Sequence, residues 1–200
     1  MATSRSTPRL RLTALLLAAL VVLVASSERT AATGLAGLAL QLAGLACIGC
    51  AALGRIWTSL FIAGYKDAQL VRQGPYAALR HPLYALSLLA MLGAGLTTRS
   101  VAISVGLLVA FAAIYAAASR VEDRFLHGAH GEAFQRYARE VRAFLPRPTS
   151  HAVPESLEVR PRVLWKAFLD AGTLLAYWVL LVFADGLQQQ GVTPTWITLP

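Results

Sequence analysis

Five long apolar segments constrain the fold of this chain more than any other feature of its sequence. They cover residues 10–25, 31–53, 83–96, 100–119 and 168–187. A helix needs about 20 mostly apolar residues to cross a bilayer, and its backbone polar groups must be satisfied within the helix. With 56% hydrophobic and 14% charged residues, this 200-residue chain has more apolar surface than a soluble domain of its size can cover. We therefore predict an all-α polytopic membrane protein with about five transmembrane helices.

The third and fourth segments are close neighbours in the sequence. Only TTRS stands between the two apolar runs, and the run at 83–96 is short for a membrane span. This spacing predicts a tight helical hairpin over residues 83–119.

The basic residues are distributed unevenly between the connections. Of the 18 Lys and Arg residues, three (Arg5, Arg9 and Arg11) lie before or at the start of the first segment, four lie in the connection 54–82, and nine lie between Arg120 and Lys166. The remaining two, Arg29 and Arg99, are isolated in the other two connections. Because basic loops tend to stay in the cytoplasm, we predict an inner-membrane protein with a cytoplasmic N-terminus and two long cytoplasmic connections. The net charge of +8 then indicates attraction to anionic membrane lipids and not nucleic-acid binding.

Two features of the N-terminal part have alternative interpretations. The first segment follows Arg residues and ends in small residues near Ala25, which also resembles a secretory signal peptide; we favour an uncleaved helix. Cys47 and Cys50 form CIGC within the second segment, but no His or third thiol accompanies them there. We interpret them as small residues at a helix contact and predict no metal site.

The stretch GPYAALRHPLY, residues 74–84, begins with a Gly-Pro turn signal and contains a second proline at position 82. A proline disfavours helix at the preceding residue and suits the first helical position, so the third helix should start at Pro82. The first N–H groups of that helix attract a carboxylate or phosphate, and Arg80 and His81 lie at the same place. The alternative is a simple anchor at the membrane surface, with Tyr76 and Tyr84 in the interfacial belt.

The second long connection begins with RVEDRFLHGAHGEAFQRYAREVRAFLPRP. Glu122 and Asp123 directly follow the fourth segment, near a negatively charged membrane surface, so they need Arg partners or a cationic ligand. Beyond Gly131, apolar residues recur at helical spacing: Phe134, Tyr137, Val141 and Phe144. An amphipathic helix is expected there, and a helix lying on the membrane would also explain the pattern.

Taken in order, RHPLY, a helical hairpin and ED followed by HGAHGEAFQRYAREVRAFLP resemble the isoprenylcysteine carboxyl methyltransferase and phospholipid methyltransferase superfamily. The resemblance covers roughly residues 53–147, including GRIWTSLFIAGYK. It implies an integral membrane enzyme that uses S-adenosylmethionine in a pocket formed by the cytoplasmic connections. The residues expected to bind this cofactor are Arg80, His81, Leu83, Tyr84 and Glu122.

Methyl transfer from a cationic donor requires mainly alignment and the exclusion of water. The motifs offer no obvious dedicated base, which favours an anionic acceptor such as a carboxylate, gripped by arginine. We expect Arg120, Tyr137 and Arg139 to act at the catalytic step, on a lipophilic acceptor that enters from the bilayer between helices. Ala118 stands where the prenylcysteine enzymes have a substrate-holding Arg, so the resemblance does not identify the acceptor.

The chain then divides into two N-terminal helices (1–53), a methyltransferase core (54–147) and a loop with an extra C-terminal helix (148–200). Two other functions compete with this interpretation. A sterol reductase-like NADPH enzyme has a comparable motif, but Leu83 and Ala85-Leu86 replace its Asn and its Gly-Glu. A non-enzymatic membrane helper would use the same loops to bind a partner protein.

Overall fold

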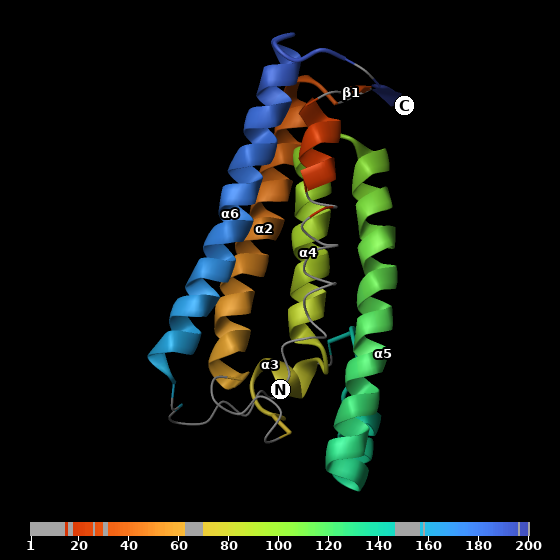
Figure 1. Cartoon of the computed structure of the whole chain (residues 1–200), viewed down its shortest axis with the longest axis vertical. Coiled ribbons are helices and arrows are strands. Elements are labelled where there is room, and N and C mark those ends of the chain that lie inside the picture. The colour runs from red at the N-terminus through yellow and green to blue at the C-terminus, as the bar shows by residue number, and fades with distance from the viewer. Residues whose placement is uncertain are drawn as a thin grey trace.

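In the computed structural model, four helices lie side by side along the long axis of the molecule (Figure 1). They are α2 (Gly34–Ile62), α4 (Pro82–Thr97), α5 (Val101–Glu140) and α6 (Pro161–Gln189), with the short helix α3 (Pro75–Ala78) before α4. Strands β1 (Ser27–Arg29) and β2 (Ile197–Leu199) form a small parallel pair that joins distant parts of the chain. The structure describes residues 15, 18–25, 27–29, 32–62, 70–146, 157, 159–195 and 197–199. Apart from this short strand pair, the structure is helical, and the predicted all-α architecture is confirmed.

Within the described residues, α2, α5 and α6 are each long and apolar enough to cross a membrane, and α4 is a shorter apolar helix. The protein is therefore an integral membrane protein. Residues 18–25 are helical and belong to the first predicted span. Most of the rest of that span, and with it the question of cleavage, lies outside the described residues.

The predicted hairpin consists of α4 and the first part of α5, which pack against each other. Helix α4 begins at Pro82 as predicted, and the Ser100 side chain caps α5 by accepting a hydrogen bond from the Ile103 N–H. Between the helices, Arg99 adopts a left-handed conformation (φ 59°), which usually selects glycine just after a helix.

Two glycines allow α2 and α4 to approach closely. A Cβ atom added at Gly93 would lie 2.7 Å from the Gly44 carbonyl oxygen, and one at Gly44 would lie 2.7 Å from the Gly93 oxygen. Small residues of this kind let helix backbones meet in a membrane, where packing drives association. The Gly44–Gly93 contact therefore fixes the spacing of these two helices.

Gly93→Ala should lower the free energy of unfolding by about 1 to 3 kcal/mol, because the new methyl group would push the α2 and α4 backbones apart. The control is Gly106→Ala on α5, where an added Cβ has open space, so this change should be neutral or slightly stabilising. Denaturation of both variants in mixed detergent micelles measures the difference. Equal stability of the two variants would contradict the close contact.

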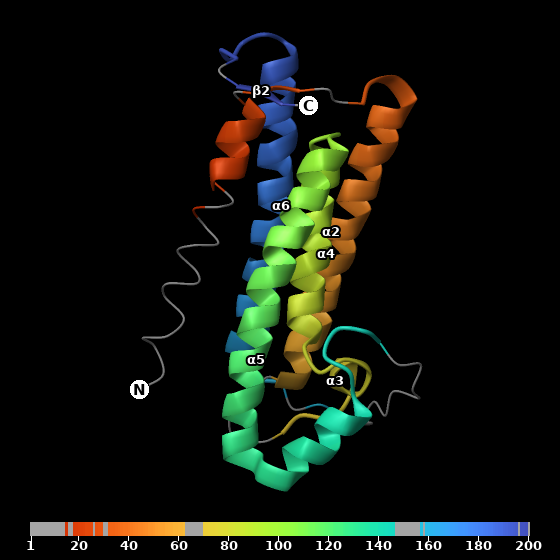
Figure 2. The same cartoon turned by 90° about the vertical axis from the view of Figure 1, so that its right-hand side faces the viewer.

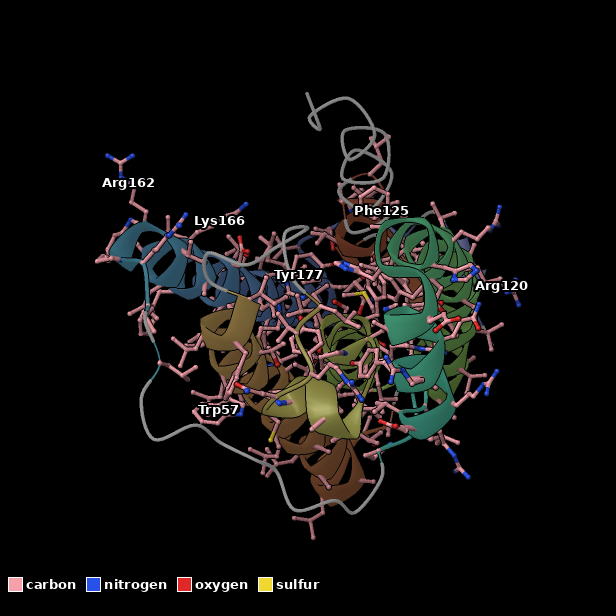
Figure 3. The ribbon with its side chains drawn as sticks, turned by 90° about the horizontal axis from the view of Figure 1, so that it is seen from below. Trp57, Arg120, Phe125, Arg162, Lys166 and Tyr177 are labelled. Atoms are coloured by element: carbon pink, nitrogen blue, oxygen red, sulfur yellow. The ribbon has the colours of Figure 1, made fainter. Side chains whose placement is uncertain are left out.

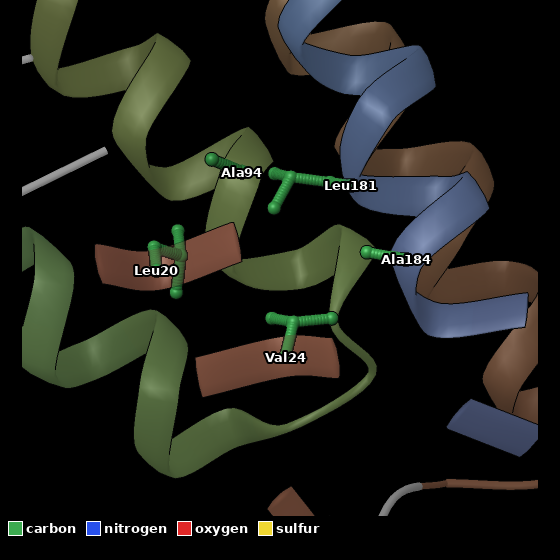
Figure 4. Close-up of a cluster of buried hydrophobic side chains, with 5 residues drawn as sticks. All are labelled: Leu20, Val24, Ala94, Leu181 and Ala184. Carbon is green, nitrogen blue, oxygen red and sulfur yellow. The ribbon is translucent and has the colours of Figure 1, made fainter. Parts of the chain in front are cut away.

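Helix α6 is held to the bundle by an apolar cluster that includes the helical segment 18–25. Figure 4 shows Leu20 and Val24 of this segment beside Ala94 of α4 and Leu181 and Ala184 of α6. Val24 and Leu181 are fully buried. The first predicted span therefore contributes to the core of the bundle.

The tip of the hairpin is also tied to α6, by a buried ion pair. Arg99 Nη2 lies 3.1 Å from Asp185 Oδ2, and Asp185 is only 1% exposed. Asp185 also accepts hydrogen bonds from Gln189 (2.7 Å) and Gln41 (3.4 Å), and Arg99 donates to the Ala32 carbonyl. The expectation that Arg99 is isolated was wrong, because its partner lies 86 residues away in sequence.

Three helix boundaries differ from the prediction. Helix α2 continues to Ile62 instead of ending at 53, because Thr58 and Phe61 still bury one face of it. Helix α5 continues to Glu140, with a single non-helical residue at Gly131. Helix α6 begins at Pro161, whose fixed φ suits a helix start, and not at 168.

Candidate cofactor site

The chain reverses direction after the membrane-spanning part of α5. Gly131 has φ 52°, a conformation that is strained for residues other than glycine, and Figure 2 shows the segment beyond it returning toward α3 and α4. There Phe134, Tyr137 and Val141 form a buried cluster against Leu70. The apolar stripe predicted beyond Gly131 therefore packs onto the protein and does not face the membrane.

Backbone hydrogen bonds join this returning segment to the RHPLY stretch. The N–H of Arg80 donates to the Arg142 carbonyl (2.9 Å), and the N–H of His81 donates to the Ala143 carbonyl (3.2 Å). In addition, the Tyr137 hydroxyl donates to the Tyr76 carbonyl at 2.7 Å. The two polar connections are thus fastened together at one end of the bundle.

Two acidic residues of α5 meet the start of α4 at this place. His81 is 4% exposed, its Nε2 lies 2.9 Å from Asp123 Oδ1, and its Nδ1 lies 3.8 Å from Glu122 Oε2. Arg80 Nη2 lies 3.5 Å from Asp123 Oδ2. We call Arg80, His81, Leu83, Glu122 and Asp123 the mouth.

The geometry of His81 determines what its second ring nitrogen can do. A carboxylate only accepts hydrogen bonds, so Nε2 carries the proton that Asp123 accepts, and in the neutral ring Nδ1 then presents a lone pair. That lone pair faces the carboxylate of Glu122, whose side chain is 43% exposed. Two acceptors side by side, one of them charged and open to solvent, suit a cationic donor such as an ammonium group.

The other half of the mouth suits an anion. The N–H of Leu83 lies in the first turn of α4, where no carbonyl of the same helix can accept its hydrogen bond. The Nε atom of Arg80 is buried and has no hydrogen-bond partner in the described part of the chain. The mouth therefore has hydrogen-bond acceptors on one side and hydrogen-bond donors on the other.

A row of stacked aromatic rings extends from the mouth to the membrane-spanning part of α5. The His81 ring stacks on Tyr84 (5.6 Å between centroids), and Tyr84 stacks on Tyr115 of α5 (5.3 Å). Phe144 lies 6.0 Å from the His81 ring on another side. A flat aromatic ligand group would find stacking partners here.

The two tyrosines that join the connections remain neutral. Burial, followed by the nearby charge of Glu122, raises the pKa of Tyr76, and burial also raises the pKa of Tyr137 despite the opposing effect of Arg80. At neutral pH both are therefore phenols, and the Tyr137 hydroxyl serves as a donor to Tyr76. Its expected catalytic role stays a prediction.

The structure brings Arg80, His81, Leu83, Tyr84 and Glu122 together at one end of the bundle, and their expected binding of the cofactor stays a prediction. It does not place the two expected catalytic arginines in the same way. Arg120 and Arg139 are exposed, and Figure 3, viewed from the end that carries the mouth, shows Arg120 at the outer edge of the molecule. Their expected contact with an acceptor stays a prediction.

Sequence reasoning did not assign a role to Asp123, although it makes the shortest polar contact to His81. Its position next to Glu122 was the available signal. It also missed Arg72, which lies over the Tyr137 ring (5.6 Å) and pairs with Glu140 at 2.6 Å. The contacts of Arg72 with Tyr137 and Glu140 depend on the reversal at Gly131, which the spacing of charges alone does not reveal.

The geometry defines a membrane protein with a charged, partly open site at the membrane surface. A family model described as phospholipid methyltransferase matches residues 30–133, and the chain belongs to this family. It is 37% identical to the cobalt-zinc-cadmium resistance protein CzcN of Cupriavidus metallidurans, over 78% of this chain and 72% of that protein. It is 32% identical to the nickel-cobalt-cadmium resistance protein NccN of Alcaligenes xylosoxydans xylosoxydans, over 81% and 76%. No solved structure matches the chain.

Proposed function

We propose that the protein is an S-adenosylmethionine-dependent methyltransferase whose cofactor binds at the mouth. The observation that supports this most strongly is the position of His81 Nδ1, 3.8 Å from the Glu122 carboxylate and beside the first turn of α4, where both atoms can accept from one ammonium group. The methionine part of the cofactor carries an ammonium and a carboxylate on one carbon atom. The mouth offers a partner of the opposite kind for each of these groups.

In this proposal Glu122 and His81 hold the ammonium, while the Leu83 N–H and the Arg80 guanidinium hold the carboxylate. Tyr84 and Tyr115 are positioned to stack on the adenine. When bound, the cofactor supplies an electrophilic methyl group. The chain itself orients the ligand and keeps water out through the hydrogen bond between Tyr137 and Tyr76. A carboxylate acceptor is already ionised, so no proton has to be removed before methyl transfer.

The acceptor in this proposal is a lipophilic or membrane-anchored molecule that arrives through the bilayer. A carboxylate fits best because the two basic groups of the mouth, His81 and Glu122, are occupied by the ammonium in this proposal. The excess of basic residues on this side favours a cytoplasmic mouth in the inner membrane. The same residues attract anionic membrane lipids.

Calorimetric titration of S-adenosylmethionine into the protein in lipid nanodiscs tests the proposal. The natural protein should bind in a saturable manner, and Glu122→Gln should weaken binding about 10- to 100-fold, because a hydrogen bond to a charged group is lost. Glu132→Gln, an exposed position on the same helix, is the control and should bind like the natural protein. A folded natural protein that binds no S-adenosylmethionine would refute the proposal.

The names of the two relatives favour a second property, a role in metal resistance. Within the described part of the chain, no group of three His, Cys, Asp or Glu residues could hold a metal ion. We therefore place this role in methylation of a membrane component and not in direct metal binding. Growth of a deletion strain in cobalt, zinc or cadmium distinguishes methylation from direct metal binding. The natural gene should restore growth, and the gene with Glu122→Gln should not.

A further inference from the structure

A cavity of about 630 Å³ lies next to the mouth, between α2 and the start of α4. It is open on one side and is lined by the end of α2, by α3 and by the first two turns of α4, with Phe144 and Pro146 of the returning segment as a further wall. On α4, Ala85 and Leu89 point into it at helical spacing. The cavity is therefore built from three separate parts of the chain.

The lining of the cavity is almost entirely apolar. No charged side chain contributes to it among the described residues, and its polar side-chain groups are the buried Thr58 hydroxyl and the Trp57 indole. Trp57 is 45% exposed, and aromatic residues of this type favour the membrane interface. Burying a charged or strongly polar ligand group here would be costly, so the lining selects a hydrocarbon.

Phe144 connects the cavity with the mouth. The same side chain lines the cavity and lies 6.0 Å, centroid to centroid, from the His81 ring. Pro82, which lines the cavity, is bonded directly to His81. A molecule with an apolar tail in the cavity can therefore place its head at the mouth by extending past these residues.

The volume restricts the kind of tail. A methylene group takes up about as much space as a water molecule, roughly 30 Å³, so the cavity has room for roughly twenty of them. This is enough for one long acyl or prenyl chain, and it lies in the usual range for a pocket that holds one small ligand. It is too little for the two chains of a common phospholipid.

We propose that this cavity binds the hydrocarbon chain of the methyl acceptor, and that the acceptor is a single-chain amphiphile with its nucleophilic group at the head. This inference rests on the proposed function. The family description would suggest an acceptor with two hydrocarbon chains, as in a common phospholipid, whereas the acceptor inferred here has one.

Photocrosslinking in nanodiscs tests the inference with two probes: a palmitic acid with a diazirine in mid-chain, and a phosphatidylcholine with the same diazirine on one acyl chain. Mass spectrometry then locates the labelled peptides. The fatty acid should label the cavity walls at 54–58 and 85–89, and excess unlabelled palmitate should compete. The phosphatidylcholine should label only lipid-exposed faces.

Ala85→Phe fills the cavity and should reduce labelling by the fatty acid about tenfold, the loss expected when a few methylene groups lose their apolar site. Leu89→Trp fills it from a second position and should act in the same direction. Ala113→Phe, on an exposed face of α5, is the matched control and should label normally. Calorimetry with S-adenosylmethionine is done on every variant and should give unchanged affinities.

The outcomes distinguish this inference from the proposed function. If the natural protein binds S-adenosylmethionine but the fatty acid does not label the cavity, or the phosphatidylcholine labels it equally, the inference is wrong and the proposed function stands. If Ala85→Phe and Leu89→Trp both abolish cofactor binding in folded protein, the cavity holds part of the cofactor and the inference is also wrong. Absence of cofactor binding by the natural protein refutes the proposed function itself.

Discussion

Asp185→Leu should lower the free energy of unfolding by about 3 to 5 kcal/mol, because it leaves the Arg99 guanidinium buried without its carboxylate partner. The Arg99 side chain is only 11% exposed, so water cannot readily replace the lost ion pair. Gln41 and Gln189 would also lose the oxygen atom to which they donate. Denaturation in mixed micelles, followed by circular dichroism, measures the loss.

Asp170→Leu makes the same chemical change at an exposed position of α6 and should have little effect. Arg99→Gly combined with Asp185→Leu removes both charges and should recover most of the stability, since glycine also suits the left-handed backbone at position 99. If Asp185→Leu is no worse than Asp170→Leu, the ion pair does not hold α6 to the hairpin.

The second large effect is expected at the mouth, where Asp123→Ala should weaken S-adenosylmethionine binding about 10- to 100-fold. Asp123 contacts His81 and Arg80 and has no ligand contact in the proposal, so the loss would be indirect. The His81 ring would no longer be fixed, and its Nδ1 lone pair would no longer be directed to the Glu122 side. Calorimetric titration, together with a thermal unfolding curve for each variant, measures this effect.

Asp123→Asn provides a graded comparison, since its amide oxygen can still accept the hydrogen bond from Nε2. We expect Asp123→Asn to retain more affinity than Asp123→Ala, with similar unfolding curves for both, and Glu132→Ala to match the natural protein. Equal losses for Asn and Ala would mean that the charge of Asp123, and not its hydrogen bond to the ring, is what the site needs.

Local signals predicted the parts of the fold that depend on neighbouring residues. Pro82 starts a helix because its ring fixes φ and its missing N–H is not needed there, and TTRS breaks two apolar runs at the hairpin tip. The end of α2 could not be predicted in the same way. Polar residues after position 53 do not end a helix when Thr58 and Phe61 still pack against neighbouring elements.

Two residues of the candidate site, His81 and Glu122, were predictable because each belongs to a short motif that can be recognised in the sequence. The role of Asp123 was not predictable, because it depends on which of two adjacent carboxylates the helix directs toward the His81 ring. Arg120, two residues before Glu122, lies on a different face of α5 because helical neighbours are about 100° apart. The Arg99–Asp185 pair was beyond sequence reasoning, since nothing local links the hairpin tip to α6.

Helix α5 has a further consequence for how the protein fits its membrane. It runs without interruption from the cap at Ser100 to Glu122, a distance of roughly 33 Å at 1.5 Å per residue, close to the thickness of a hydrocarbon core. The Arg99–Asp185 ion pair and the mouth therefore lie at opposite ends of one uninterrupted stretch of helix, which keeps the distance between them fixed. In a thinner bilayer the whole bundle must tilt, and in a thicker one the lipid must thin around it, so the distances between His81, Glu122 and Asp123 are preserved.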